Sequence, residues 1–215
     1  MYVPAHFAAS AAEVAELLAS MTAVDLITPG PDGLVATFLP MLHDSGSLLG
    51  HVARNNPHWQ VAASAVAGSG VAGAGVAGAG VAGESLAIVR GPDAYVSPSW
   101  YPSKAEHGRV VPTWNYVTAQ VFGQLVVHDD VDWLRSLVTR LTERHEDGLA
   151  APWAVADAPT AFIDGQLRAI VGVELVISRI EAKAKLSQNR SAADQAGVVT
   201  GLGADSPVGS LVRPS

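Results

Sequence analysis

The 215-residue chain contains no cysteine, so disulfide bonds, thiolate catalysis and cysteine-ligated zinc or iron–sulfur sites are excluded. Cations are scarce as well, with 13 Lys and Arg against 20 Asp and Glu, which gives a formal net charge of −7. Any binding to nucleic acid or to an anionic membrane therefore needs a local basic patch. Only 15% of the residues are charged and 49% are hydrophobic, which predicts a globular chain with a buried core.

The usual catalytic and targeting motifs are also missing. The N-terminus lacks the basic segment and apolar core of a secretory signal, so a cytoplasmic location is expected. The chain has no GxSxG, GxxxxGK[ST] or HExxH motif. His51 and His58 could share a helix end, but no carboxylate lies close to them in sequence, so no metal site is predicted. No catalytic residue is assigned.

Residues 62–83 form a low-complexity repeat of Gly, Ala and Val. The pentads of this repeat begin at Val66, Val71, Val76 and Val81. Its many glycines and its lack of Leu, Ile and Phe argue against a membrane-spanning helix, so a surface insertion between strands is expected. The repeat also matches GxGxxG three times, as a by-product, whereas a Rossmann turn needs one such loop between a strand and a helix.

Hydrophobic periodicity and turn chemistry predict many strands and a few helices. The predicted strands cover 23–28, 34–42, 47–53, 86–90, 94–97, 170–180 and two segments of 111–128 that bend at Gly123; a turn is expected at 91–93. The predicted helices cover 11–20 behind a Ser10/Glu13 capping box, 57–62, 131 to a stop at Gly148, and a short helix after Ser191. Without regular strand–helix alternation, this pattern indicates a mainly β fold, a barrel with peripheral α-helices. A single domain over 1–202 and a flexible tail over 203–215 are expected.

The first hundred residues contain only two cations, Arg54 and Arg90. Arg54 lies in the string GHVARNNP, at the end of a predicted strand and just before a helix that begins at Pro57. The free N–H groups and the dipole of a helix N-terminus favour an anion, and guanidinium, imidazole and amide donors lie beside them. The segment therefore suits a phosphate, or is a simple helix cap next to a surface arginine.

Two further features suit a ligand. The strings SPSWYPSK (97–104) and PTWNY (112–116) place aromatic rings beside hydrogen-bonding side chains. Such residues can stack on and read a planar ring, and they equally suit a core or a dimer interface. Between Arg179 and Arg190 there are four cations and the single acid Glu181, which makes this segment a second anion patch or a solvated face.

Several long strings are specific enough to identify a family. They are MYVPAHF (1–7), TFLP (37–40), GHVARNNPHW (50–59), GPDAYVSPSWYPSK (91–104), VPTWNYV (111–117), RHE (144–146) and KLSQNRSAADQAGVV (185–199). In this order they resemble the PaiB-type family of FMN-binding negative transcriptional regulators over residues 1–202, apart from the repeat. The repeat falls where a short connection is expected.

The resemblance implies a split β-barrel related to pyridoxamine-phosphate oxidases and flavin reductases, and a homodimer that binds FMN at the subunit interface. It places the phosphate near His51, Arg54, Asn55 and Asn56. It places the isoalloxazine near Thr37, Leu39, Trp100, Trp114 and Asn115, in part from the partner subunit. Lys185, Gln188 and Asn189 match the family's terminal motif, and the resemblance implies that Lys185 and Gln188 contact the cofactor.

The resemblance leaves more than one function open. The first is an FMN-binding regulatory protein, and the alternative is an FMN-dependent oxidoreductase, in which the flavin itself carries the chemistry. A third is a structural dimer that has lost its cofactor. The acidic charge and the lack of a helix-turn-helix pattern give direct DNA binding little support. Indirect action is expected, or a dimer surface that joins two copies of the segment 179–190.

Overall fold

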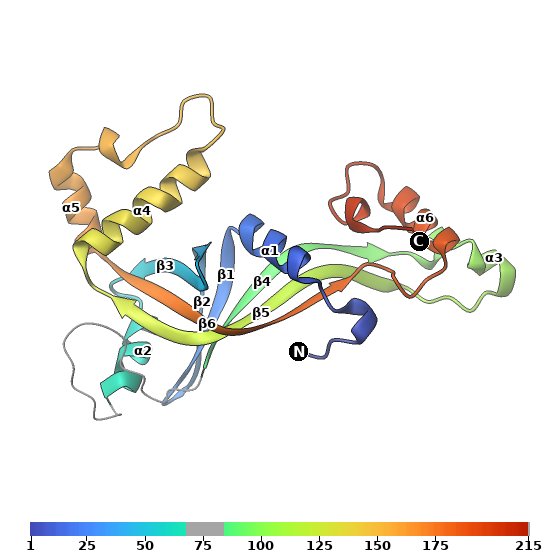
Figure 1. Ribbon diagram of the computed structural model, residues 1–215, viewed down its shortest axis with the longest axis horizontal. Helices are drawn as coiled ribbons and strands as arrows, with labels where there is room; N and C mark the ends of the chain where they lie inside the picture. The colour runs from blue at the N-terminus through green and yellow to red at the C-terminus, as the bar shows by residue number, and fades with distance from the viewer. Residues whose placement is uncertain (68–83, 215) are drawn as a thin grey trace. The chain divides into compact units, whose positions relative to one another are not determined.

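The structure is a computed structural model that describes residues 1–67 and 84–214 (Figure 1). Its strands are β1 (Ala23–Gly30), β2 (Gly33–Asp44), β3 (Ser47–Ala53), β4 (Ser85–Val96), β5 (Thr113–His128) and β6 (Ile170–Lys185). Its α-helices are α1 (Ala11–Ser20), α2 (His58–Ala67), α3 (Ser103–His107), α4 (Val131–Glu146), α5 (Thr160–Arg168) and α6 (Ala192–Leu202). The strands form a closed barrel in the order β1-β2-β3-β6-β5-β4. The prediction of a mainly β barrel with peripheral helices is confirmed.

The chain divides into two compact units, and β4, β5 and β6 contribute residues to both. Unit 1 comprises Met1–Leu18, Val89–Gln120 and Glu181–Ser215. Unit 2 comprises Ala19–Ile88 and Val121–Ile180.

The hairpin of β1 and β2 in unit 2 has one buried face and one exposed face. The two strands pair antiparallel from Ala23 opposite Pro40 to Gly30 opposite Gly33, around the predicted turn. On the inward face of β2, Leu39 is 3% exposed; on the opposite face, Leu34 is 75% and Phe38 is 73% exposed. Apolar side chains exposed in this way on a strand are typical of an interaction surface.

The helix starts predicted from capping residues are confirmed. Ser10 Oγ accepts the N–H of Glu13 at 3.3 Å, and Glu13 Oε2 accepts the N–H of Ser10 at 2.7 Å, before α1. Asp130 Oδ1 accepts the N–H groups of Asp132 and Trp133, at 3.1 and 2.8 Å, at the start of α4. Each cap satisfies N–H groups that have no partner within the helix.

Two strands are longer than predicted, because the glycines inside them permit close packing rather than turns. β4 continues through Gly91, where a Cβ would lie 3.0 Å from side-chain atoms of Leu17 and Val117. β5 continues through Gly123, where a Cβ would lie 2.1 Å from the carbonyl oxygen of Val176 in β6. The turn predicted at Gly91 is wrong, and the two segments predicted on either side of Gly123 form one continuous strand. A glycine in a strand segment can mark a turn or bend, or the close approach of a neighbouring element, and sequence alone does not distinguish these two roles.

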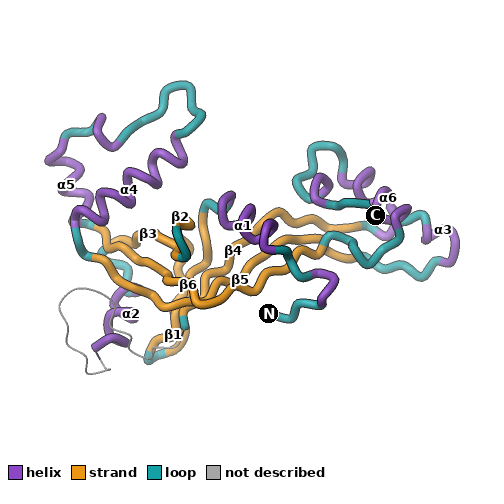
Figure 2. Tube along the Cα trace, in the orientation of Figure 1, coloured by secondary structure: helices purple, strands orange, loops and turns teal. Residues whose placement is uncertain are grey.

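Helices α4 and α5 of unit 2 lie next to each other (Figure 2). Leu137 and Leu141 of α4 form a buried cluster with Leu42 of β2 and Leu49 of β3. Another turn of α4 packs on α5, which the sequence pattern did not reveal. The apolar stripe that predicted α4 thus covers one face of the β2–β3 pair.

The C-terminal tail of unit 1 is packed. Val208 is 1% and Val212 is 5% exposed, on either side of a short 3₁₀-helix at Gly209–Leu211. This packing replaces the flexible tail expected for residues 203–215. The insertion predicted at 62–83 begins within α2, and its part from 68 to 83 lies outside the described residues.

Candidate functional site

The residues predicted to contact a cofactor are divided between the two units. Unit 2 contains Thr37 and Leu39 in β2, His51 in β3, and Arg54, Asn55 and Asn56 in the loop between β3 and α2. Unit 1 contains Trp100, Trp114, Asn115, Lys185 and Gln188. Within each unit the structure brings several of these side chains together.

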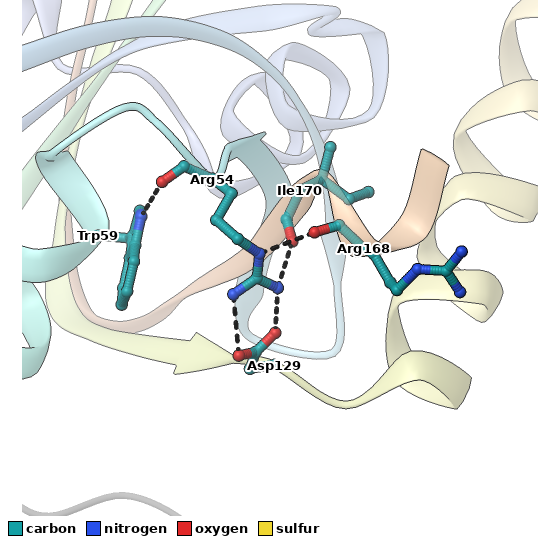
Figure 3. Close-up of polar contacts among 5 residues, drawn as sticks. All are labelled: Arg54, Trp59, Asp129, Arg168 and Ile170. Carbon is teal, nitrogen blue, oxygen red and sulfur yellow. Dashed lines mark hydrogen bonds and ion pairs between the residues drawn. The ribbon is translucent and has the colours of Figure 1, made fainter. Parts of the chain in front are cut away.

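Arg54, which follows β3, has its guanidinium held by protein groups (Figure 3). Nη1 donates to Asp129 Oδ2 at 3.0 Å, and Nη2 donates to Oδ1 of the same carboxylate. Nε donates to the carbonyl oxygen of Arg168 at 2.8 Å, and Nη2 also donates to that of Ile170 at 3.0 Å. Four of the five guanidinium N–H groups are thus in use. We call this arrangement the Arg54 clamp, because it ties the β3–α2 loop to the end of β5 and the start of β6.

The ion pair in the clamp also sets the charge of this region. The hydrogen bond from Arg54 is the main cause that lowers the pKa of Asp129, so the carboxylate stays ionised at neutral pH. The same bond raises the pKa of Arg54. The positive charge that made Arg54 a candidate phosphate ligand is therefore balanced within the protein.

The β3–α2 loop is fixed by three more hydrogen bonds. Trp59 Nε1 donates to the carbonyl oxygen of Arg54 at 2.9 Å (Figure 3). The N–H of Arg54 donates to the carbonyl oxygen of Ala169 at 2.8 Å. Asn56 Oδ1 accepts the N–H of His58 at 2.9 Å and so caps α2, as predicted. The loop presents the exposed Asn55 from a rigid backbone next to the start of a helix.

A buried chain of hydrogen bonds runs from Thr37 into the core of unit 2 through His58. The His58 ring is 1% exposed, with Nδ1 at 2.8 Å from Thr37 Oγ1 and Nε2 at 2.8 Å from Thr28 Oγ1. Thr28 Oγ1 lies 2.9 Å from Ser85 Oγ. Burial lowers the pKa of His58, so the ring is neutral, with one nitrogen donating and the other accepting. Sequence reasoning missed this role, because nothing in the string NNPHW shows where its histidine points.

His51 in β3 has a different environment. Its Nδ1 is buried and has no hydrogen-bond partner among the described residues. Burial lowers the pKa of His51, so this ring is neutral too. An unpartnered buried nitrogen destabilises the folded protein, which suits a position where a ligand supplies the missing hydrogen bond. Leu39, by contrast, packs into the core, and the Thr37 hydroxyl is turned toward His58.

The two buried histidines make stability depend on pH. Their folded-state pKa values lie below the ordinary value of 6.5, so the unfolded chain binds protons where the folded chain does not. Their contribution to the free energy of unfolding should be complete above about pH 7 and should decrease as pH falls through 6.5 toward the folded-state values. Urea unfolding at several pH values would measure this. His58→Gln should make the free energy of unfolding fall less as the pH is lowered, whereas His145→Gln, at an exposed position, should leave its pH dependence unchanged. The same pH dependence of the free energy of unfolding in both variants would contradict the prediction.

In unit 1, Asn115 and Lys185 lie on one cavity. Asn115 is fully buried, and its Nδ2 donates to Ser187 Oγ at 2.9 Å. Lys185 Nζ donates to the carbonyl oxygen of Trp114 at 2.9 Å and to the hydroxyl of Thr113. These contacts join the start of β5 to the end of β6.

The remaining predicted residues of unit 1 have other partners. The Trp100 ring packs on α6, where a Cβ at Gly201 would lie 2.2 Å from it. Gln188 closes its own loop, accepting the N–H of Leu186 at 2.7 Å. Trp114 is 48% exposed, and its Nε1 donates to Asp93 at 3.1 Å. Of the two tryptophans, Trp114 is the more available for stacking.

Two features, a membrane-spanning helix and a metal-binding cluster, are absent from residues 1–67 and 84–214. Within these ranges no helix has the length and apolar character needed to span a membrane. Nor do His, Asp and Glu side chains gather there in a group that could hold a metal ion.

The barrel and the match to an FMN-binding family together define a class, the split-barrel flavoproteins. A conserved hypothetical protein of Mycobacterium tuberculosis superposes with a TM-score of 0.59, covering 88% of this chain and 92% of its own at 14% identity. Residues 1–179 match the family described as "Putative FMN-binding domain", and the chain belongs to this family. The split-barrel fold and FMN as the cofactor, both implied by the sequence resemblance, are confirmed.

Two relatives extend this result. An uncharacterized protein of Emericella nidulans is 32% identical over 185 residues, which are 79% of this chain and 73% of the relative. The protease synthase and sporulation protein PAI 2 of Bacillus subtilis is 27% identical over 207 residues, covering 94% of this chain and 89% of that protein. The resemblance to the PaiB-type family is thereby confirmed.

Proposed function

We propose that the protein is an FMN-binding regulatory protein that holds its cofactor at a homodimer interface, on the outer face of the β2–β3 pair. One observation carries the proposal. Leu42 of β2 lies opposite Leu49 of β3, and side chains alternate along each strand. The exposed Phe38 and the unpartnered His51 therefore lie on the same face of the pair as Leu42 and Leu49. Helix α4 covers Leu42 and Leu49 on this face, and beside them lie the exposed Phe38 and a buried His51 nitrogen with no hydrogen-bond partner among the described residues.

The residues on this face fit FMN. A flavin supplies hydride or single-electron transfer when bound, and the protein supplies binding and orientation. His51 Nδ1 offers one hydrogen bond, and Asn55 with the remaining Nη1–H of Arg54 lies at the start of α2, where an anion is favoured. The Arg54 clamp acts as a positioning element for the loop. Trp114, half exposed, is the aromatic side chain proposed to come from the partner subunit.

A regulatory role has two supports. The Bacillus subtilis relative is named for protease synthesis and sporulation rather than for a reaction. Two of the four cations of segment 179–190 already have partners: Arg179 pairs with Glu84 and lies 3.7 Å above the Phe122 ring, and Lys183 faces the Tyr116 ring at 5.5 Å. Arg179 and Lys183 are thus engaged within the protein, and the chain is acidic as a whole, so we infer indirect action. Salt-sensitive DNA binding by the purified protein in a gel-shift assay would contradict that inference.

The proposal is tested on the purified full chain. Titration with FMN, followed by quenching of flavin fluorescence, should give saturable binding, and the flavin should co-elute with a dimer from a sizing column. NADH and NADPH should then bleach the bound flavin no faster than free FMN. Faster bleaching would replace the regulatory role by the oxidoreductase alternative, and a protein that ignores FMN would overturn the site.

Phe38 offers a direct test of the interface. Phe38→Glu should shift elution toward the monomer and weaken FMN binding at least tenfold, because a charge replaces a central apolar contact worth about 2 kcal/mol or more. Phe162→Glu on α5 is the matched control, since Phe162 is 57% exposed but lies outside the proposed face. Equal behaviour of the two variants would show that β2 is not the interface.

A further inference from the structure

Unit 1 contains a cavity of about 160 Å³ that the FMN site on β2 and β3 does not use. Its walls include Tyr101, Asn115, Lys185, Ser187, Asn189 and Arg190. Two of its lining side chains are cations, and none of them is a carboxylate. At roughly 30 Å³ for each water, the volume holds about five waters, which suits a phosphate or a small carboxylic acid but not an isoalloxazine ring.

Tyr101 provides an independent sign of a ligand. The side chain is 2% exposed, and its buried hydroxyl has no hydrogen-bond acceptor among the described residues, with the Arg190 guanidinium beside it. Arg190 lies over the Tyr101 ring, with Cζ 4.7 Å from the ring centroid. Burial raises the pKa of Tyr101, so the phenol keeps its proton and can donate it. A buried hydrogen-bond donor without an acceptor is unfavourable unless a ligand in the cavity accepts its hydrogen bond.

The loop that carries Arg190 is held in one conformation. Ser187 has a φ of 68°, a left-handed backbone conformation that is strained for a residue other than glycine. The conformation is held by Asn115, whose Oδ1 accepts from Ser187 Oγ at 3.2 Å. The N–H of Arg190 donates to the carbonyl oxygen of Ser187 at 2.9 Å, and Gln195 Nε2 donates to that of Arg190 at 2.9 Å. Backbone strain that neighbours maintain in this way is common at binding sites.

The charges around the cavity favour an anion. Lys185 and Arg190 both line the cavity, and no carboxylate lines it. Burial is the main cause that lowers the pKa of Lys185, and the charges of Lys183 and Arg190 act in the same direction. Lys185 Nζ has two protein acceptors and so keeps one N–H for a ligand. The negative charge of Asp194 also acts on Tyr101, and the Asp194 carboxylate accepts two hydrogen bonds from Ser103, at 3.1 and 2.8 Å.

We propose that this cavity binds a small oxyanion, the carboxylate or phosphate group of a small molecule, with Tyr101, Lys185 and Arg190 as donors. The site is separate from the one that takes the FMN phosphate, and in that respect it rests on the function proposed above. A regulatory flavoprotein would thereby have a second input besides its cofactor.

The test uses the full chain, both free of FMN and saturated with it. Inorganic phosphate and acetate are titrated by calorimetry at constant ionic strength, with chloride as the background anion. Binding is expected for at least one of the two probes, to the same extent in both forms of the protein. Binding of phosphate alone would point to a phosphorylated ligand, and binding of acetate to a carboxylic acid. If saturation with FMN abolishes binding, the cavity belongs to the cofactor and the proposal fails, although FMN binding itself is then retained.

Two variants locate the binding. Tyr101→Phe and Arg190→Gln should each lower the affinity for the probe at least tenfold, because each removes a hydrogen bond to a charged group. Arg109→Gln is the control, since it makes the same charge change at an exposed position of unit 1. Without any probe, Tyr101→Phe should also raise the melting temperature, because it removes a buried hydroxyl that has no acceptor in the described part of the chain. If both cavity variants bind the probes like Arg109→Gln, the cavity is not the site.

Discussion

Replacing Arg54 by alanine is expected to weaken FMN binding about ten- to a hundredfold, which corresponds to about 1.5–3 kcal/mol. The substitution removes four hydrogen bonds of the Arg54 clamp and leaves the Asp129 carboxylate without its partner. The β3–α2 loop then loses its connection to the end of β5, and an uncompensated negative charge remains near a site proposed for a phosphate. Fluorescence titration with FMN measures the change.

A second variant decides how Arg54 acts. If Arg54 binds the phosphate directly, Asp129→Asn releases the guanidinium from its ion pair and strengthens FMN binding. If Arg54 works through the clamp, Asp129→Asn weakens binding, and the double variant resembles Arg54→Ala, because the two side chains form one unit. We expect the second outcome, since the guanidinium has only one N–H group left. Arg135→Ala is the control, because it breaks a comparable ion pair with Asp164 elsewhere in unit 2.

The Arg54 clamp also shows what sequence could reveal about the site. The scarcity of cations singled out Arg54, and the string GHVARNNPHW placed it correctly between a strand and a helix. Its partner Asp129 lies 75 positions further along the chain and meets it only because β5 ends where β3 ends. The partners of His58, Thr37 and Thr28, are likewise brought together by strand pairing. Sequence reasoning could find the segment, but not which of its polar groups the protein itself already occupies.

For the fold, too, local features could be predicted from the sequence, whereas contacts with distant residues could not. Elements whose boundaries depend on local chemistry were predicted closely: α1 after its capping box, β3 over 47–53 and α4 after Asp130. Errors occurred where a residue serves a distant neighbour. Gly123 suggests a break in the strand when only its own segment is considered. The residue it accommodates, Val176, belongs to a strand that lies much further along the sequence.

Gly123→Ala should consequently lower the free energy of unfolding by about 3 kcal/mol, at the upper end of the range for overpacking. The added Cβ would lie 2.1 Å from the carbonyl oxygen of Val176, and backbone atoms cannot move aside as a flexible side chain can. Urea unfolding with tryptophan fluorescence measures the loss.

Gly165→Ala is the matched control for that experiment. The same methyl group is added within α5, where the nearest atom, Arg168 Nη2, is 3.9 Å away. Here alanine should raise the free energy of unfolding by about 0.4–1 kcal/mol, since it favours the helix and restricts the unfolded chain. If the added methyl group lowers the free energy of unfolding at Gly123 and raises it at Gly165, contact with β6 is the reason that position 123 requires glycine. A Gly123→Ala variant as stable as the wild type would mean that β5 and β6 are not so close, and that a bend at this position explains the glycine after all.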